Sequence, residues 1–185
     1  VRASMEIKSD AIVESNKPVV KVPEATPSTT QKSVEKTVED NCIPKTTQYT
    51  TYKVTEKELV VLAKIVYREA RGVKHTREKA AVIWTILNRV DSDQSIFPDD
   101  IISVATQPHQ FAWEPDTPVW DELYDLAVDV TDRWIREKNG ETDVGRVLPK
   151  DYLFFASHGD GINWFRKTFE SRTYWDWDCY DPYND

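Results

Sequence analysis

Aromatic residues and glycine are absent from the first 48 positions of this 185-residue chain, and this segregation constrains its folding more than any other feature. All seven Trp, eight Tyr and six Phe lie at or after Tyr49. The earlier segment is rich in Lys, Glu, Val, Thr, Ser and Pro, and such a segment buries too little apolar area to offset its ordering entropy. We therefore expect residues 1–48 to be a disordered linker or tail and residues 49–185 to form one folded domain.

Charge and cysteine content narrow the class of protein. The net charge of -8 and the pI near 5.0 argue against a nucleic-acid partner, which would need a basic surface. The sequence holds no apolar run long enough to span a membrane, and because it begins at Val1 we expect that an export signal has been removed. The two cysteines, Cys42 and Cys179, either form a disulfide in an exported protein or remain separate thiols.

Hydrophobic periodicity after Tyr49 predicts an α+β domain that is mainly helical with a small β element. The expected helices are about 55–70, 76–90, 98–104 and 117–139. Pro98 is expected to open the third, and Thr117 to cap the fourth ahead of Pro118. The run "YLFFAS" at 152–157 predicts a buried strand or core segment, and the aromatic stretch 162–183 predicts a hairpin or loop.

The first of these helices carries the most informative residue, Glu69. Thr55 and Glu58 form a capping box at its start, and Gly72 is expected to stop it. At about 100° per residue, Glu69 projects into the apolar side of the helix. Lost hydration and the negative end of the helix dipole both favour the protonated carboxyl there. Glu69 is therefore a candidate general acid.

Two alternatives stay open at this point. Glu69 is also placed to form a structural ion pair with Arg71, Arg77 or Arg89. Trp residues outside the helices either stack on sugar rings in a groove or cover the core, whereas Trp84 and Trp134 on helix faces are expected in the core. The Trp residues expected in loops or short strands are Trp113, Trp164, Trp175 and Trp177.

Three segments together resemble the cell-wall hydrolase family that includes the spore cortex-lytic enzymes. They are "LVVLAKIVYREARG", "AAVIWTILNRV" and "QPHQFAW", in that order. The matching positions are Glu69 to Gly72, Leu87 to Val90, and Gln110 with Phe111, and the resemblance covers about residues 56–165. The chain departs from the family at Val73, where a polar or acidic residue is usual, and in its C-terminal ending "SRTYWDWDCY".

The resemblance implies a lysozyme-like fold and a secreted protein of the cell wall, expected to act as a monomer on peptidoglycan glycan strands. It implies cleavage between N-acetylmuramic acid and N-acetylglucosamine by a lytic transglycosylase, with Glu69 as the single acid/base. No cofactor and no metal are implied. The candidate substrate-binding residues are Gln110, Phe111, Trp113, His158, Asn163 and Trp164, although His158 is more typical of a surface loop.

Other functions remain as alternatives. A hydrolase would need a second carboxylate, and no motif singles out Glu114, Asp116, Asp160 or Glu170. A non-catalytic peptidoglycan-binding module would not need Glu69 in an apolar setting. An N-acetylmuramoyl-L-alanine amidase would need clustered zinc ligands, and the three histidines His75, His109 and His158 show no such spacing.

Overall fold

The structure is a computed structural model and describes residues 52–157 and 161–185, which belong to one compact unit. Within these residues it contains four helices and a two-stranded antiparallel sheet, so the predicted α+β, mainly helical class is confirmed. The elements are α1 (Glu56–Ala70), α2 (Thr76–Val90), α3 (Ile101–Thr106), α4 (Asp121–Lys138), β1 (Phe154–Ser157) and β2 (Asn163–Arg166). The expected tail, residues 1–48, lies outside the described residues.

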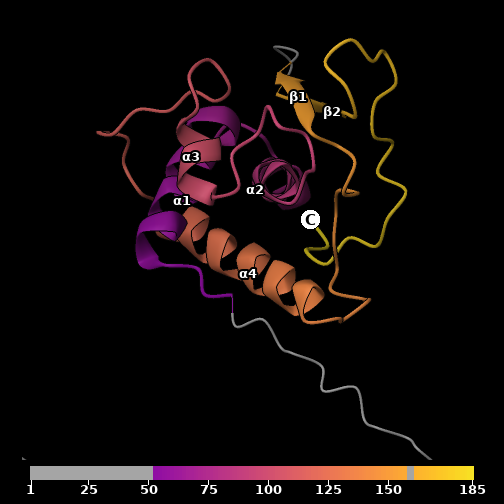
Figure 1. The fold of residues 1–185 in the computed structure, drawn as a ribbon, viewed down its shortest axis with the longest axis horizontal. Helices are drawn as coiled ribbons and strands as arrows, with labels where there is room; N and C mark the ends of the chain where they lie inside the picture. Colours follow the sequence, from indigo (N-terminus) through magenta and orange to yellow (C-terminus); the bar gives the residue numbers. More distant parts are fainter. Residues whose placement is uncertain (1–51, 158–160) are drawn as a thin grey trace, which may run out of the picture. The chain divides into compact units, whose positions relative to one another are not determined.

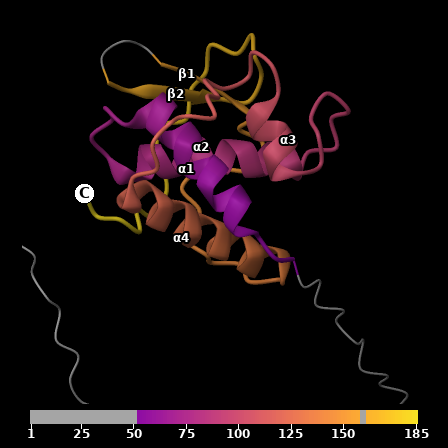
Figure 2. The ribbon, with the colours of Figure 1, turned by 90° about the vertical axis from the view of Figure 1, so that its left-hand side faces the viewer.

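Helix α2 is the centre of the core. In Figure 1 it is seen end-on, with α1 and α3 on one side, α4 below and the sheet above. Figure 2, turned by 90°, shows α1 crossing in front of α2 while α4 runs along the lower side. Residues 80–89 of α2 are all buried, and α2 contacts α1, α3, α4 and β1. Trp84 on α2 and Trp134 on α4 are fully buried, which confirms that both are core residues.

Helix α1 begins as its sequence predicts. The Thr55 Oγ1 accepts a hydrogen bond from the Glu58 N–H at 3.3 Å, and the Thr55 N–H donates to the Glu58 carboxylate at 2.7 Å. The predicted capping box is therefore present. The helix ends at Ala70, but Gly72 does not adopt the positive φ of a glycine stop. Instead Arg71 continues in right-handed helical geometry as the C-cap.

The start of α3 differs from the prediction. The helix begins at Ile101, and Asp100 is its N-cap because the Asp100 carboxylate accepts from the Ser103 N–H at 2.9 Å. Pro98 lies before the cap and does not open the helix. A carboxylate that satisfies a free N–H group at a helix start thus overrides the preference of Pro for the first helical turn.

The start of α4 was also predicted too early. Thr117 is buried and donates its N–H to the Glu114 carbonyl at 3.1 Å, so it closes a loop turn. The helix begins at Asp121 with Trp120 as N-cap. Asp121 and Glu122 supply negative charge at the positive end of the helix dipole. Gly140, with φ of 94°, follows the end of α4 as expected.

The sheet and the C-terminal segment cover the other side of α2. Strands β1 and β2 pair with Phe154 opposite Arg166 and Ser157 opposite Asn163, so a strand lies within 152–157 as expected. The strand itself is half-buried to exposed, and only Tyr152 and Leu153 ahead of it are buried, so the expectation of a buried segment holds for those two residues alone. The segment after β2 is irregular, and the Trp175 indole N–H donates to the Val147 carbonyl at 3.0 Å. The Trp177 ring packs edge-on against Phe165. These two Trp residues therefore cover the core.

Two polar residues at the end of α2 bind the chain that leads into β1. Asn88 Nδ2 donates to the carbonyls of Pro149 and Tyr152 at 2.8 and 2.9 Å, and Arg89 Nε donates to the Leu153 carbonyl at 2.7 Å. Asn88 Oδ1 accepts from Arg146 Nη1 at 2.7 Å. Asn88 and Arg89 are 2% and 3% exposed. The position of β1 against α2 is thus set by side chains of α2 that satisfy buried carbonyl groups.

Replacing Asn88 by Leu is expected to destabilise the domain by about 3 kcal/mol, because two buried carbonyls lose their donors and Arg146 loses an acceptor. Urea unfolding followed by Trp fluorescence measures this change. Lys57→Ala, on the exposed side of α1, is the control and should stay within about 0.5 kcal/mol of wild type. Equal unfolding midpoints for Asn88→Leu and wild type would show that these bonds do not hold β1.

Candidate functional site

Glu69 lies in the last turn of α1 and is half-buried. Its Oε1 atom accepts a hydrogen bond from the Ala112 N–H at 2.5 Å. Ala112 is the middle residue of a tight turn, because the Trp113 N–H donates to the Phe111 carbonyl at 2.8 Å. The turn therefore aims a backbone donor at the carboxylate, and it fixes one Glu69 oxygen as an acceptor.

The arginines that the sequence offered as partners of Glu69 bind elsewhere. Arg71 Nη1 donates to the Tyr67 carbonyl at 3.2 Å, and Arg77 lies 3.7 Å from the Asp181 carboxylate. Arg89 is bound to carbonyl and amide oxygens. No Lys, Arg or His in the described part of the chain lies within 4 Å of the Glu69 carboxylate. The geometry thus does not support a structural ion pair for this residue.

The loop after α3 wraps along α1 beyond Glu69. Lys64 Nζ donates to the Pro115 carbonyl and lies 5.9 Å from the Trp113 ring centroid. Trp113 is half-buried and, like Phe111, is next to Ala112 in the sequence. A second aromatic pair, Tyr67 with Trp120 at 4.9 Å, belongs to another side of the helix. Tyr67 lies about 160° around the helix from Glu69.

Gly161, which precedes β2, lies close to the turn that follows Glu69. A Cβ atom built on Gly161 would lie 3.9 Å from the Gly72 carbonyl oxygen. Gly161 has φ of 81°, a conformation that favours glycine. On the adjoining strand, Trp164 stacks edge-on against Tyr174 at 4.5 Å. The end of α1, the Ala112 turn and the hairpin thus meet around the same turn of the chain.

The remaining candidate residues occupy different environments. Phe111 is 9% exposed and packs against Phe155, while Gln110 is exposed and binds Arg89. Asn163 is 2% exposed, and neither polar atom of its side chain has a hydrogen-bond partner among residues 52–157 and 161–185. His158 lies outside the described residues. The structure therefore brings Gln110, Phe111 and Trp113 together on one loop, and it places Asn163 and Trp164 on β2.

A buried carboxylate that sequence reasoning missed lies beside Asn163. Glu78, in the first turn of α2, is 5% exposed and accepts from the Asn163 N–H at 3.2 Å. An acidic residue in a first helical turn is so common that its sequence position carried no signal of burial. Glu78 ties the start of β2 to α2, so it acts as an anchor for the hairpin.

The cysteine at the C-terminal side is half-buried. Cys179 Sγ donates to the Val147 carbonyl at 3.6 Å, and burial raises the pKa of its thiol above the ordinary value. Cys42, its proposed partner, lies outside the described residues, so the disulfide stays a prediction. The described residues contain no group of three or more His, Cys, Asp or Glu side chains that could hold a metal ion.

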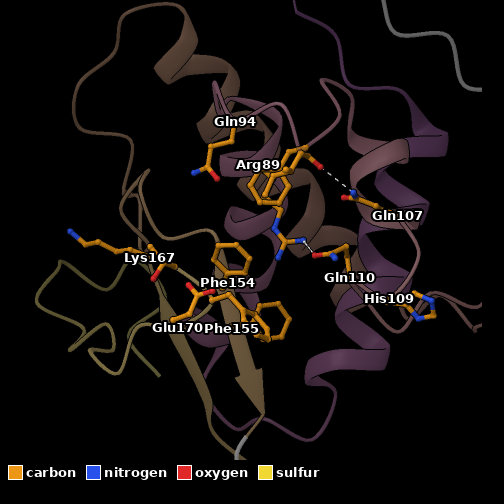
Figure 3. Close-up of a pocket in the computed structure, with 13 residues that line it drawn as sticks. Arg89, Gln94, Gln107, His109, Gln110, Phe154, Phe155, Lys167 and Glu170 are labelled. Atoms are coloured by element: carbon orange, nitrogen blue, oxygen red, sulfur yellow. Dashed lines mark hydrogen bonds between the residues drawn. The ribbon is translucent and has the colours of Figure 1, made fainter.

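A pocket of about 670 Å³ is lined in part by Gln107, His109 and Gln110, from the loop that also binds Glu69. Figure 3 shows Arg89 and Gln110 at its wall, joined by a hydrogen bond of 3.1 Å, with Phe154 and Phe155 beside them. Glu69 does not line this pocket. The loop 107–113 therefore makes a hydrogen bond to each of two polar groups, the carboxylate of Glu69 and the guanidinium of Arg89.

Comparisons with protein-family models, with curated proteins and with solved structures found no match. Among the described residues no helix has the length and apolar character needed to cross a membrane. Assignment of a function to this site therefore depends on its geometry and on the sequence motifs.

Hydrogen exchange should report the contact between Glu69 and the Ala112 N–H. Glu69→Ala removes the acceptor and should accelerate exchange of the Ala112 amide about fivefold, equivalent to about 1 kcal/mol for one hydrogen bond. Glu69→Gln keeps an oxygen acceptor and should leave exchange near the wild-type rate. Amide exchange followed by NMR makes the measurement, and identical rates in wild type and Glu69→Ala would refute the contact.

Proposed function

We propose that residues 49–185 form a cell-wall lytic enzyme that cleaves the glycan strand of peptidoglycan. The bond is the one between N-acetylmuramic acid and N-acetylglucosamine, and the reaction is that of a lytic transglycosylase. In this proposal the domain is lysozyme-like, is exported, and belongs to the cell-wall hydrolase family that its motifs resemble.

The observation that best supports this function is the environment of Glu69. Its carboxylate is half-buried at a helix end, is free of cationic partners among the described residues, and is held at one oxygen by the Ala112 N–H. A carboxylate kept for an ion pair would have a cation within reach, whereas a general acid needs one oxygen oriented and the other directed to substrate. The Ala112 turn meets the first of these needs.

The proposed reaction uses Glu69 twice. Protonated Glu69 donates its proton to the glycosidic oxygen, and the bond from that oxygen to C1 of the muramic acid breaks. The ionised Glu69 then accepts the proton of the muramyl 6-hydroxyl, whose oxygen forms a new bond to C1. The products are a free 4-hydroxyl on N-acetylglucosamine and a 1,6-anhydro-muramic acid end, so protons and bonds balance.

Residues near Glu69 suggest how a glycan would be held. Trp113 offers an aromatic ring next to the turn that binds Glu69, and sugar C–H faces stack on such rings. On the hairpin side, Trp164 offers a second ring, stacked edge-on with Tyr174. We propose that a strand passes Glu69 between these two aromatic residues.

Hydrolysis would need another carboxylate near the reacting carbon. Of the loop acids, Glu114 and Asp116 are exposed on the segment that Lys64 fastens to α1, and Glu170 lines the Arg89 pocket. None of these three lies next to Glu69 in the contacts described above, and Asp160 lies outside the described residues. We therefore favour the mechanism with one carboxylate.

Glu69→Gln should lower cleavage of purified peptidoglycan by about 10²- to 10⁴-fold, because the amide cannot donate the proton. Mass spectrometry of the released fragments should find 1,6-anhydro-muramic acid ends with wild type and almost none with the variant. Glu56→Gln, an exposed acid on the same helix, is the matched control and should cleave like wild type.

Each other result of this experiment has a defined meaning. Products with reducing ends instead of anhydro ends would show that the enzyme is a hydrolase and not a lytic transglycosylase. Full activity of Glu69→Gln would remove Glu69 from the mechanism. Wall binding without cleavage by wild type would favour the non-catalytic binding module, and release of intact peptides would favour an amidase.

A further inference from the structure

Arg89 is a buried cation without a matching anion. Its side chain is 3% exposed, and burial lowers the pKa of its guanidinium to about 10. No Asp or Glu within the described ranges comes within 4 Å of it. An unpaired charge in such a place is costly, because the guanidinium has lost water and gained no counter-ion.

The surrounding residues accept hydrogen bonds from only some N–H groups of this guanidinium. Of its five N–H groups, Nε donates to the Leu153 carbonyl and one Nη1 proton to Gln110 Oε1. The other N–H groups have no hydrogen-bond partner in the part of the chain that the structure describes. Three rings face the cation, Phe97 at 4.9 Å, Phe111 at 4.8 Å and Phe154 at 5.3 Å, and they offset part of the lost hydration.

The pocket at Arg89 has the size and lining of a ligand site. Its volume of about 670 Å³ suits a mono- or disaccharide or a short peptide. Phe154 and Phe169 supply apolar walls, and Gln94, Gln107 and Gln110 supply amide groups (Figure 3). The Oε1 atom of Gln107 is buried and accepts no hydrogen bond within the described part of the chain, so a second polar group is available to a ligand.

The charged side chains that line the pocket favour a ligand with a single negative charge. Lys167 also lines it, but its ammonium is paired with the Asp151 carboxylate at 2.6 Å. Glu170 lines the same pocket and would repel a second negative charge. Because the chain carries a net charge of -8, attraction of an anion must come from a local cation rather than from the whole surface.

We propose that this pocket binds a carboxylate carried on an uncharged sugar or peptide body, with the free N–H groups of Arg89 as its partner. Arginine suits this role because its planar fork can donate two parallel hydrogen bonds to one carboxylate. The Gln110 amide, already bound to Arg89 through Oε1, keeps its Nε2 donors for the same ligand.

The identity of the ligand rests on the proposed function. Peptidoglycan offers two carboxylates of this kind: the lactyl group of N-acetylmuramic acid from which the peptide has been removed, and a carboxylate on the peptide itself. Both present the same chemistry to Arg89, so the ligands in the experiment must separate them.

The first test uses the wild-type full chain and needs no substitution. The Arg89 Nε–H resonance is followed by ¹⁵N NMR during titration with N-acetylmuramic acid or with its methyl ester. We expect the acid to shift this resonance and to bind at least about tenfold more tightly than the ester, because the ester lacks the charge. N-acetylmuramoyl-L-alanyl-D-isoglutamine carries its carboxylate on the peptide, so binding of this ligand alone would assign the peptide as source.

Two variants test the named residues. Gln110→Leu changes an exposed side chain and removes its amide donors, so it should weaken binding of the acid several-fold. Arg89→Lys keeps the charge but loses the fork, and where it remains folded it should lose the preference for acid over ester. Equal binding of acid and ester by wild type, or no binding of any of the three ligands, would overturn the proposal.

Failure of this proposal and failure of the proposed function are distinguishable. Glu69→Gln should bind the acid like wild type while it loses cleavage, since Glu69 does not line the pocket. If cleavage depends on Glu69 but no carboxylate binds, the proposed enzymatic function stands and the proposed carboxylate site is wrong. If the acid binds preferentially but no cleavage occurs, the carboxylate site stands and the proposed enzymatic function is wrong.

Discussion

The rest of the domain depends on the hydrogen bonds that Asn88 and Arg89 make to the backbone between Pro149 and Leu153. Helix α2 is buried on nearly all sides, so any polar group on it must find a partner inside the protein. The two side chains meet this requirement by donating hydrogen bonds to carbonyls of the segment that leads into β1. In doing so they fix where β1 starts, and β1 in turn positions β2.

The same pair also organises the two polar features of the loop after α3. Arg89 binds Gln110, and two residues further on the Ala112 N–H binds Glu69. Phe111 lies between them and packs beneath the guanidinium. The loop is therefore held at both ends by α1 and α2, and this explains how an irregular segment can present a backbone donor at a defined place.

Local signals in the sequence predicted much of the fold. The capping box of Thr55 and Glu58, the apolar run in α2 and the run before Ser157 are strong local signals, and they predicted the start of α1, the bounds of α2 and the presence of β1, although not its exposure. The starts of α3 and α4 were not, because Asp100 and Trp120 displaced the more obvious Pro98 and Thr117. Competition between nearby start signals is settled by packing, which a single sequence does not display.

The candidate site was predictable only in part. Motifs pointed to Glu69 and to the loop with Gln110, and the structure joins them through Ala112. Burial of Glu78 and of Asn163, and the absence of a counter-ion around Arg89, depend on contacts across many residues. An Arg in a helix normally signals a solvated surface, so its place among three Phe rings had no local signature.

The long reach of the Asn88 and Arg89 bonds bears on the order in which the chain assembles. Their partners lie 61 to 64 residues further along, so these bonds close a large loop. The chain loses the conformational entropy of that loop before the hydrogen bonds can stabilise it. Contacts of such sequence separation are slow to form. During synthesis from the N-terminus, α1 and α2 can pair early, while the buried donors of α2 stay open until the segment at Pro149 emerges. Until then, the apolar surface of α2 can be covered only by elements that have already been synthesised, such as α1 and α3.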